Sequence, residues 1–309
     1  MFIGHEKQWE FLKKSADAEK ISHAYLFSGQ SALGKKKVAL EFVKLLFCKG
    51  KEPCNTCISC KNLEKGIHPD FFLLEPQKPE KSKTDRREIK ISQIRDLAWK
   101  MSLYPALSPL KAAIITDAHQ MNQEAQNCLL KTLEEPKGRA VLILLTDRPR
   151  LLLDTVSSRM QGIRFFPVSQ EKIENHIKKI GLSEKKAKEI SLLSFGKPEL
   201  AFMLSQDPQA VRYQNQKIKE LIQLVKSDLP ARFQYANNVI SQKEKVRDIL
   251  SIWQQYFRSL LLERAKEGSS QESLPKLRRI IQAIQRTDSV ISTTTVNPRL
   301  ALEVFLMEL

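Results

Sequence analysis

The chain has 309 residues, 42% of them hydrophobic and 28% charged, and 51 Lys and Arg against 35 Asp and Glu give it a formal charge of +16. This composition is typical of a soluble protein of two or three domains, and ten Gly and fourteen Pro exclude collagen and most low-complexity sequences. The excess of basic residues favours acidic partners such as nucleic acid.

Short apolar segments alternate with amphipathic segments through the first half of the chain. The apolar segments predict five buried strands, at 24–29, 70–76, 111–119, 140–147 and 162–168. Apolar residues at helical spacing predict helices between them, at 35–47, 90–103 and 122–136. Strands that are apolar on both sides and separated by helices predict an α/β domain with a mostly parallel sheet, which binds ligands beyond the carboxyl ends of its strands.

The second half of the chain has a different, helical pattern. Three short helical segments occupy 169–206, and every pattern from 208 onward is helical. We therefore expect domains at 1–167, 168–207 and 208–309. The charged stretch 74–90 has no apolar pattern and predicts a mobile loop.

Nothing in the sequence predicts secretion or a membrane span. The most apolar stretch, at 140–146, is too short to cross a bilayer. The N-terminus has neither the apolar run nor the small-residue cleavage site of a signal peptide. We therefore expect a cytoplasmic protein.

A phosphate-binding loop follows the first predicted strand. Gly29, Gly34 and Lys35 match G-x-x-x-x-G-K, in which glycines let backbone N–H groups surround phosphates and the lysine reaches the β and γ phosphates. The next position should carry the Ser or Thr hydroxyl that holds Mg²⁺. Lys36 stands there instead and cannot coordinate a cation. This difference favours a relic loop that does not hydrolyse ATP, and nucleotide binding without turnover stays open.

The end of the third predicted strand departs from an ATP-hydrolysing site in a second way. Such a strand ends with an Asp for the metal and often a Glu that activates water. Thr116 occupies the expected metal position and Asp117 the expected Glu position. Asp117 alone could orient a water molecule, but it lacks the neighbouring metal ligand. Two independent losses in one site argue against turnover.

Four of the five cysteines lie close together in the sequence, in the pattern C-x5-C-x2-C-x2-C at Cys48, Cys54, Cys57 and Cys60. Clustered thiols in a reducing compartment are typical of a metal site, and four sulfur ligands favour structural zinc with no open position for catalysis. An iron–sulfur cluster and free thiols are the alternatives. Cys128 lies on an apolar helical face and is expected in the core.

Arg159 lies in a polar turn between the fourth and fifth predicted strands, which we expect at the carboxyl edge of the sheet. It is either a solvated arginine that caps local structure or an arginine finger that stabilises a transferring phosphate in an adjacent subunit. Its position alone does not decide between them.

Several of these segments together resemble the clamp-loader branch of the AAA+ ATPases, and among its bacterial DNA polymerase III subunits they are most similar to the delta-prime type. The resemblance covers most of the first two hundred residues, and LLKTLEEP followed by SSR is its most specific part. The matching segments are GHE at 4–6, SHAYLFSG at 22–29, the phosphate loop, the four cysteines, GIHPDFFLLEP at 66–76, ISQIRDL at 91–97, LLKTLEEP at 129–136 and SSR at 157–159.

The resemblance implies an ATPase-like domain with a zinc-binding insertion, a small helical lid and a helical collar that builds a pentameric ring. It implies that Ser158 and Arg159 match the Ser-Arg-Cys motif that supplies an arginine finger in trans, with Met160 in place of the cysteine. The gamma and tau subunits hydrolyse ATP, and this chain departs from them at Lys36 and Thr116. Its implied partners are gamma or tau and delta subunits, the sliding clamp and primed DNA.

Two other functions remain as alternatives. One is an ATP-hydrolysing subunit of the gamma or tau type. The other is a free-standing basic protein that binds nucleic acid, although the basic residues are spread over many helices without the interleaved aromatic residues of single-strand binders.

Overall fold

The computed structural model describes residues 3–48, 50, 52–77, 87–135, 138–242, 244–266, 273–294 and 296–309. The chain divides into two compact units, of which the first is Met1–His176 with Gly196–Leu200 and the second is Ile177–Phe195 with Ala201–Leu309. The separate domains predicted at 168–207 and 208–309 stay a prediction. Most of the predicted mobile loop, at 78–86, lies outside the described residues.

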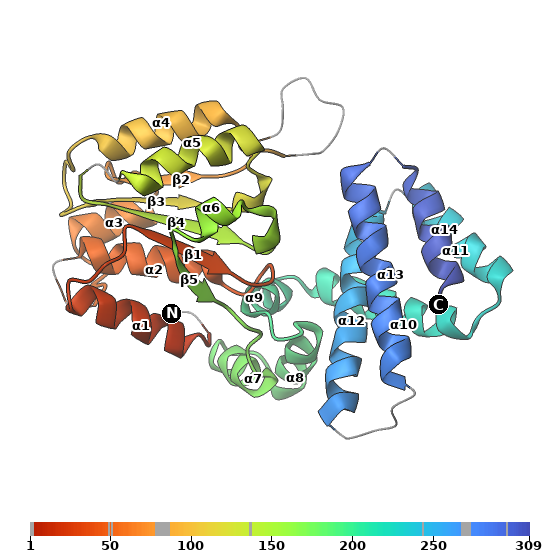
Figure 1. Cartoon of the computed structure of the whole chain (residues 1–309). Helices are drawn as coiled ribbons and strands as arrows, with labels where there is room; N and C mark the ends of the chain where they lie inside the picture. Colours follow the sequence, from red (N-terminus) through yellow and green to blue (C-terminus); the bar gives the residue numbers. More distant parts are fainter. Residues whose placement is uncertain are drawn as a thin grey trace. The chain divides into compact units, whose positions relative to one another are not determined.

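The first unit contains a five-stranded parallel sheet, in agreement with the predicted α/β fold (Figure 1). The strands lie in the order β2-β3-β4-β1-β5, so β1 lies between β4 and β5. All carboxyl ends therefore meet at one edge. The strands are β1 Ala24–Ser28, β2 Phe71–Leu74, β3 Lys111–Ile115, β4 Ala140–Thr146 and β5 Gln161–Arg164.

Helices cover both faces of this sheet (Figure 1). Helices α1, α2 and α3 pack on one face and α4, α5 and α6 on the other. The helices are α1 Glu6–Asp17, α2 Lys35–Phe47, α3 Ile58–Glu64, α4 Ile91–Ser102, α5 Gln123–Glu134 and α6 Asp154–Ser157, with single turns η1 Ala118–Gln120 and η2 Pro149–Leu151.

The alternation of side chains along each strand divides the core into two layers. In β1, Tyr25 and Phe27 belong to the layer under α2, whereas Ala24 and Leu26 belong to the layer under α4 and α5. Burial of a side chain as large as Leu or Phe contributes roughly 1.5–3 kcal/mol to the stability of the folded state. Cys128, predicted to be in the core, is partly buried and packs against the second layer.

A buried carboxylate fixes the loop between α4 and β3. Asp70 is fully buried and accepts hydrogen bonds from the backbone N–H groups of Ala106 (2.7 Å), Leu107 (2.7 Å) and Ser108 (2.9 Å). The Lys111 ammonium lies 3.7 Å from the same carboxylate. Burial alone would raise the pKa of Asp70, but the three hydrogen bonds outweigh it and hold that pKa below its usual range.

The loop that Asp70 fixes is apolar and exposed. Tyr104 is 95% exposed, and Leu103 and Leu107 are 44% and 47% exposed. The sequence between α4 and β3 carries no charged side chain and includes Pro105 and Pro109. The first unit therefore displays an apolar loop whose backbone is anchored in the core.

The remaining helices follow β5. They are α7 Gln170–Lys179, α8 Glu184–Leu193, α9 Pro198–Gln206, α10 Pro208–Lys226, α11 Leu229–Ser241, α12 Val246–Lys266, α13 Ser273–Thr293 and α14 Pro298–Met307. Asp207 and Asp228 cap α10 and α11 by accepting N–H hydrogen bonds, and prolines follow in the first turns. The all-helical character predicted for this part is confirmed.

The second unit has its own apolar core around Trp253 of α12, which is fully buried and donates its indole N–H to the Lys217 carbonyl at 2.9 Å. Ile249, Leu250 and Phe257 of the same helix are at most 5% exposed and belong to this core. Among the described residues, no helix combines the length and the apolar character needed to cross a membrane.

Candidate functional site

The phosphate loop has the predicted position, between the carboxyl end of β1 and the first turn of α2. Two of its glycines are required by geometry. A Cβ atom on Gly29 would lie 2.6 Å from the Phe165 carbonyl oxygen, and Gly34 precedes α2 with a φ of 92°. The sequence therefore preserves the tight turn that a phosphate-binding loop needs.

Lys35 is turned into its own loop. It is 8% exposed, and its ammonium donates hydrogen bonds to the carbonyl oxygens of Gly29 and Gln30 at 2.7 and 2.5 Å. Burial lowers its pKa, while Asp147 and Glu199 act in the opposite direction. A phosphate entering this loop would have to replace these carbonyl contacts, so the cation is already satisfied within the chain.

Lys36 occupies the position of the magnesium-binding hydroxyl and forms an ion pair instead. Its ammonium lies 2.7 Å from a carboxylate oxygen of Glu75, which directly follows β2. Both side chains are about half exposed, at 42% and 54%. Mg²⁺ takes oxygen ligands, so this position offers a positive charge where the ion would need a donor.

The end of β3 places Thr116 and Asp117 at the same edge as the loop. The Thr116 backbone N–H donates to the Leu74 carbonyl at 2.9 Å, which extends the pairing of β2 and β3 by one residue. Asp117 has a φ of 45° at the start of η1, and its charge acts on the Lys35 ammonium. The edge thus carries one carboxylate after β3, in the position predicted.

The structure adds a polar group that the sequence interpretation missed. His119 Nδ1 lies 3.2 Å from the Thr146 hydroxyl and 3.3 Å from an oxygen of Asp147, both at the carboxyl end of β4. Burial lowers the pKa of His119, so its imidazole is neutral near pH 7. The sequence does carry a signal for this group, because Thr146 and Asp147 are polar residues at the end of a buried apolar strand.

The four clustered cysteines come together between α2 and α3. Cys48 ends α2, and Cys57 caps α3 by accepting the Cys60 N–H at 3.4 Å. Cys54 likewise accepts the Cys57 N–H at 3.3 Å. The four sulfur atoms lie within 4.8 Å of one another. These four residues could therefore hold one metal ion.

The spacing of the sulfur atoms fits tetrahedral zinc. Zn–S bonds of about 2.3 Å put two sulfur ligands about 3.8 Å apart, and the sulfur atoms of Cys54 and Cys60 are 4.0 Å apart. Hydrogen bonds, the first of them from Thr56, lower the pKa of Cys54, whereas burial raises the pKa of Cys60. A bound cation would favour the thiolate form of all four, and the N–H···S bonds are the outer contacts that orient such ligands.

Arg159 follows α6 and leads through Met160 into the amino end of β5. Its guanidinium donates to the Thr155 carbonyl at 3.0 Å and pairs with Glu134, the last residue of α5, at 2.8 Å. Because α5 leads toward the amino end of β4, this pair lies on the side of the sheet away from the chain's own phosphate loop. The expectation that Arg159 lies at the carboxyl edge of the sheet is therefore wrong. The chain leaves β4 at that edge, but α6 returns it to the amino edge before β5 begins.

Ser158 has a local role in this turn. Its hydroxyl donates to the Thr155 carbonyl at 3.3 Å, the same oxygen that accepts from Arg159. Ser158 thus helps to shape the turn, and the guanidinium remains 40% exposed.

Comparison with known proteins assigns the fold and the motifs to one family. The sequence profile described as "DNA polymerase III, delta subunit" matches residues 4–169, which is more than half of the chain. The chain belongs to this family. The segment that matches the DNA polymerase III delta subunit family contains this chain's parallel sheet, phosphate loop, four clustered cysteines and Arg159.

Individual relatives are consistent with membership of the DNA polymerase III delta subunit family. The chain is 39% identical over 170 residues to DNA polymerase III subunit delta' of Bacillus subtilis, which covers 54% of this chain and 49% of that protein. It is 33% identical over 181 residues to the tau subunit of the same organism, which covers 58% of this chain and 31% of that protein. The chain thus matches about half or less of the length of these relatives, and the predicted resemblance to clamp-loader subunits is confirmed.

One solved structure has a similar fold over almost the whole length of the chain. The gamma subunit-related protein of Thermotoga maritima is 22% identical and covers 97% of each chain with a TM-score of 0.50. At this identity the likeness supports the fold alone.

Proposed function

We propose that this chain is a non-hydrolysing subunit of the sliding-clamp loader of a bacterial DNA polymerase III. In this function it joins gamma or tau and delta subunits in a pentameric ring that loads the sliding clamp on primed DNA in the cytoplasm. Support comes from membership of the family and from delta' and tau relatives that share its N-terminal half. The domains at 1–167, 168–207 and 208–309 would serve as ATPase-like domain, lid and collar.

The observation that carries the non-hydrolysing role is the ion pair of Lys36 with Glu75 at the magnesium position. A cation there repels Mg²⁺ and supplies no oxygen ligand. Thr116 stands where a second metal ligand is expected, and Lys35 is bonded to its own loop. All three observations argue against nucleotide turnover by this chain.

Arg159 is the residue proposed to act on a neighbouring subunit. It lies away from the chain's own phosphate loop, which argues against contact with ATP held there and supports the proposal that it contacts ATP held by another chain. Its only described ion pair is the half-exposed one with Glu134, and pairs of this kind contribute about 0.2–1 kcal/mol. An arginine finger contributes about 10³–10⁵ in rate by stabilising the transition state of the site that it contacts, and breaking this weak ion pair would cost only a small part of that gain.

The four cysteines would hold a structural zinc ion. With four thiolate ligands, zinc leaves no position for water or substrate, so its contribution is to join the end of α2 to the start of α3. This proposal concerns stability and makes no step of ATP chemistry depend on the ion.

Two measurements test the proposed function. The isolated chain should show no magnesium-dependent ATP hydrolysis above a no-enzyme control, and hydrolysis would assign it to the gamma or tau type that the tau relative represents. In a reconstituted complex, Arg159→Ala should slow ATP turnover at the facing site by about 10³–10⁵. Arg139→Ala, at an exposed arginine just before β4, is the matched control and should leave turnover unchanged. Equal turnover in both variants would exclude the finger.

A further inference from the structure

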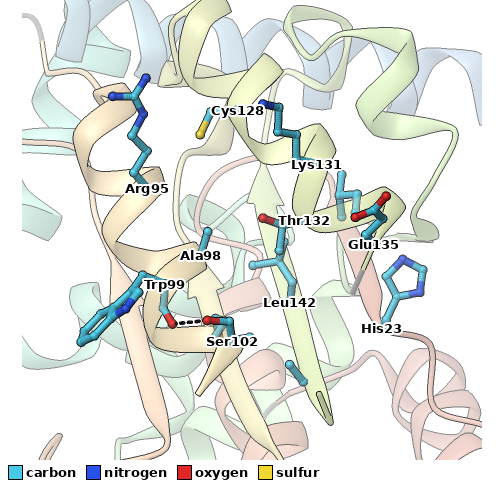
Figure 2. Close-up of a pocket in the computed structure, with 13 residues that line it drawn as sticks. His23, Arg95, Ala98, Trp99, Ser102, Cys128, Lys131, Thr132, Glu135 and Leu142 are labelled. Atoms are coloured by element: carbon cyan, nitrogen blue, oxygen red, sulfur yellow. Dashed lines mark hydrogen bonds between the residues drawn. The ribbon is translucent and has the colours of Figure 1, made fainter. Parts of the chain in front are cut away.

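A pocket of about 430 Å³ lies between α4 and α5, away from the phosphate loop (Figure 2). His23, just before β1, and Ala140, the first residue of β4, place it toward the amino ends of the strands. None of its lining residues belongs to the phosphate loop, to the end of β3 or to the turn of Arg159. The proposed function therefore leaves this pocket unexplained.

The floor of the pocket is apolar, and one wall is an exposed tryptophan. Ala98, Met101 and Leu142 are among the residues that line it. Trp99 of α4 also lines the pocket and is 63% exposed; Ala98, Trp99 and Leu142 are labelled in Figure 2. An exposed tryptophan next to an apolar hollow is typical of protein-binding sites, where such residues become the most strongly contributing contacts. The shape and chemistry suit a large apolar side chain inserted between the two helices.

Two cations stand on opposite sides of this hollow. Arg95 projects from α4 and Lys131 from α5 (Figure 2), and both are exposed. Within the part of the chain that the structure describes, neither side chain has an ion-pair partner. His23 Nε2, also at the pocket, is buried without a hydrogen-bond partner among the described residues. This pocket, the groove between α4 and α5, thus offers an apolar floor with the cations of Arg95 and Lys131 beside it.

We propose that the groove between α4 and α5 binds an acidic peptide segment of a partner protein. A large apolar side chain of the segment fills the hollow beside Trp99, and its carboxylates pair with Arg95 and Lys131. The surface suits a peptide better than a nucleic acid backbone, because Glu135, which also lines the pocket, adds negative charge four residues after Lys131. A polyanion meets repulsion there, whereas a peptide can place its few carboxylates selectively.

A displayed library of random peptides of about 12 residues, panned against the full chain, provides the probe. Counter-selection uses Ala98→Trp, which fills the hollow, and Thr132→Tyr is a second filling variant in case the first one unfolds. Lys131→Glu reverses one cation of the groove. Lys219→Glu, at an exposed lysine of α10, is the charge-matched control, and thermal unfolding verifies that each variant is folded.

The expected peptides contain a large apolar residue and at least two carboxylates. Filling the hollow should weaken their binding about tenfold or more, and Lys131→Glu should do so about fivefold, with no change for Lys219→Glu. Failure to enrich such peptides, or equal binding to wild type and filled variants, overturns the proposal. If a fluorescent DNA duplex binds Ala98→Trp and Lys131→Glu about tenfold more weakly than the wild type, and the selected peptides do not displace it, the groove is a nucleic acid contact and the proposal is also overturned. ATP turnover plays no part in these readouts, so the proposed function can fail independently.

Discussion

Removal of the carboxylate that holds Arg159 is the most direct perturbation of the proposed finger. In Glu134→Gln the 2.8 Å ion pair is lost, and the Arg159 guanidinium keeps only its bond to the Thr155 carbonyl. The two side chains are 40% and 49% exposed, so the pair contributes at most about 1 kcal/mol. At 1.4 kcal/mol per factor of ten, releasing it can favour contact with a neighbouring phosphate by no more than about fivefold.

The assay is DNA-stimulated ATP turnover of the reconstituted complex at subsaturating ATP. Glu134→Gln should raise turnover by up to about fivefold, and added salt should reduce the difference, because salt screens the pair in the wild type. Glu124→Gln, an exposed glutamate in the first turn of α5, is the matched control and should have no effect. A loss of turnover in Glu134→Gln as large as that in Arg159→Ala would refute the reasoning, since it would show that the pair is needed for the reaction.

Three further predictions concern stability and the metal site. Asp70→Ala leaves three backbone N–H groups and the Lys111 ammonium without their carboxylate and should cost about 3–5 kcal/mol in urea unfolding at pH 7. Because the pKa of Asp70 is lowered in the folded state, its contribution is present above about pH 4 and is lost as the pH falls through the folded value, so wild type and variant should converge in acid. A chelator should release zinc and make the four clustered thiols reactive toward a thiol reagent. Cys54→Ser should lower the zinc content of the purified protein, and a full zinc complement in that variant would contradict the four-cysteine site. Trp253→Ala should destabilise the second unit by about 3–5 kcal/mol and Trp253→Phe by clearly less, and equal losses would show that the indole hydrogen bond to Lys217 matters more than packing.

The fold was predictable because its strands are apolar on both sides. AYLFS at 24–28 and AVLILLT at 140–146 leave no solvated face, which only a sheet covered by helices on both faces permits. The phosphate loop and the cysteine cluster were predictable for a similar reason, since each is a short segment whose function depends on local spacing.

Contacts between distant segments were not predictable. The pair of Arg159 with Glu134 joins the turn after α6 to the end of α5, 25 positions away in the sequence, and no local pattern indicates it. The group of His119, Thr146 and Asp147 depends on β3 and β4 being neighbours in the sheet, which the order of strands in the sequence does not fix. Arg159 differs from its expected position because the segment that contains α6 returns the chain from the carboxyl end of β4 to the amino end of β5.

The loop that Asp70 fixes has a consequence for molecular recognition. A free loop loses conformational entropy when a partner covers it, and that loss weakens binding. Here folding has already removed much of that freedom, because the buried carboxylate holds three successive N–H groups just beyond Tyr104. A protein surface that covers this tyrosine would meet a group already held in place, so more of the apolar contact would appear as affinity.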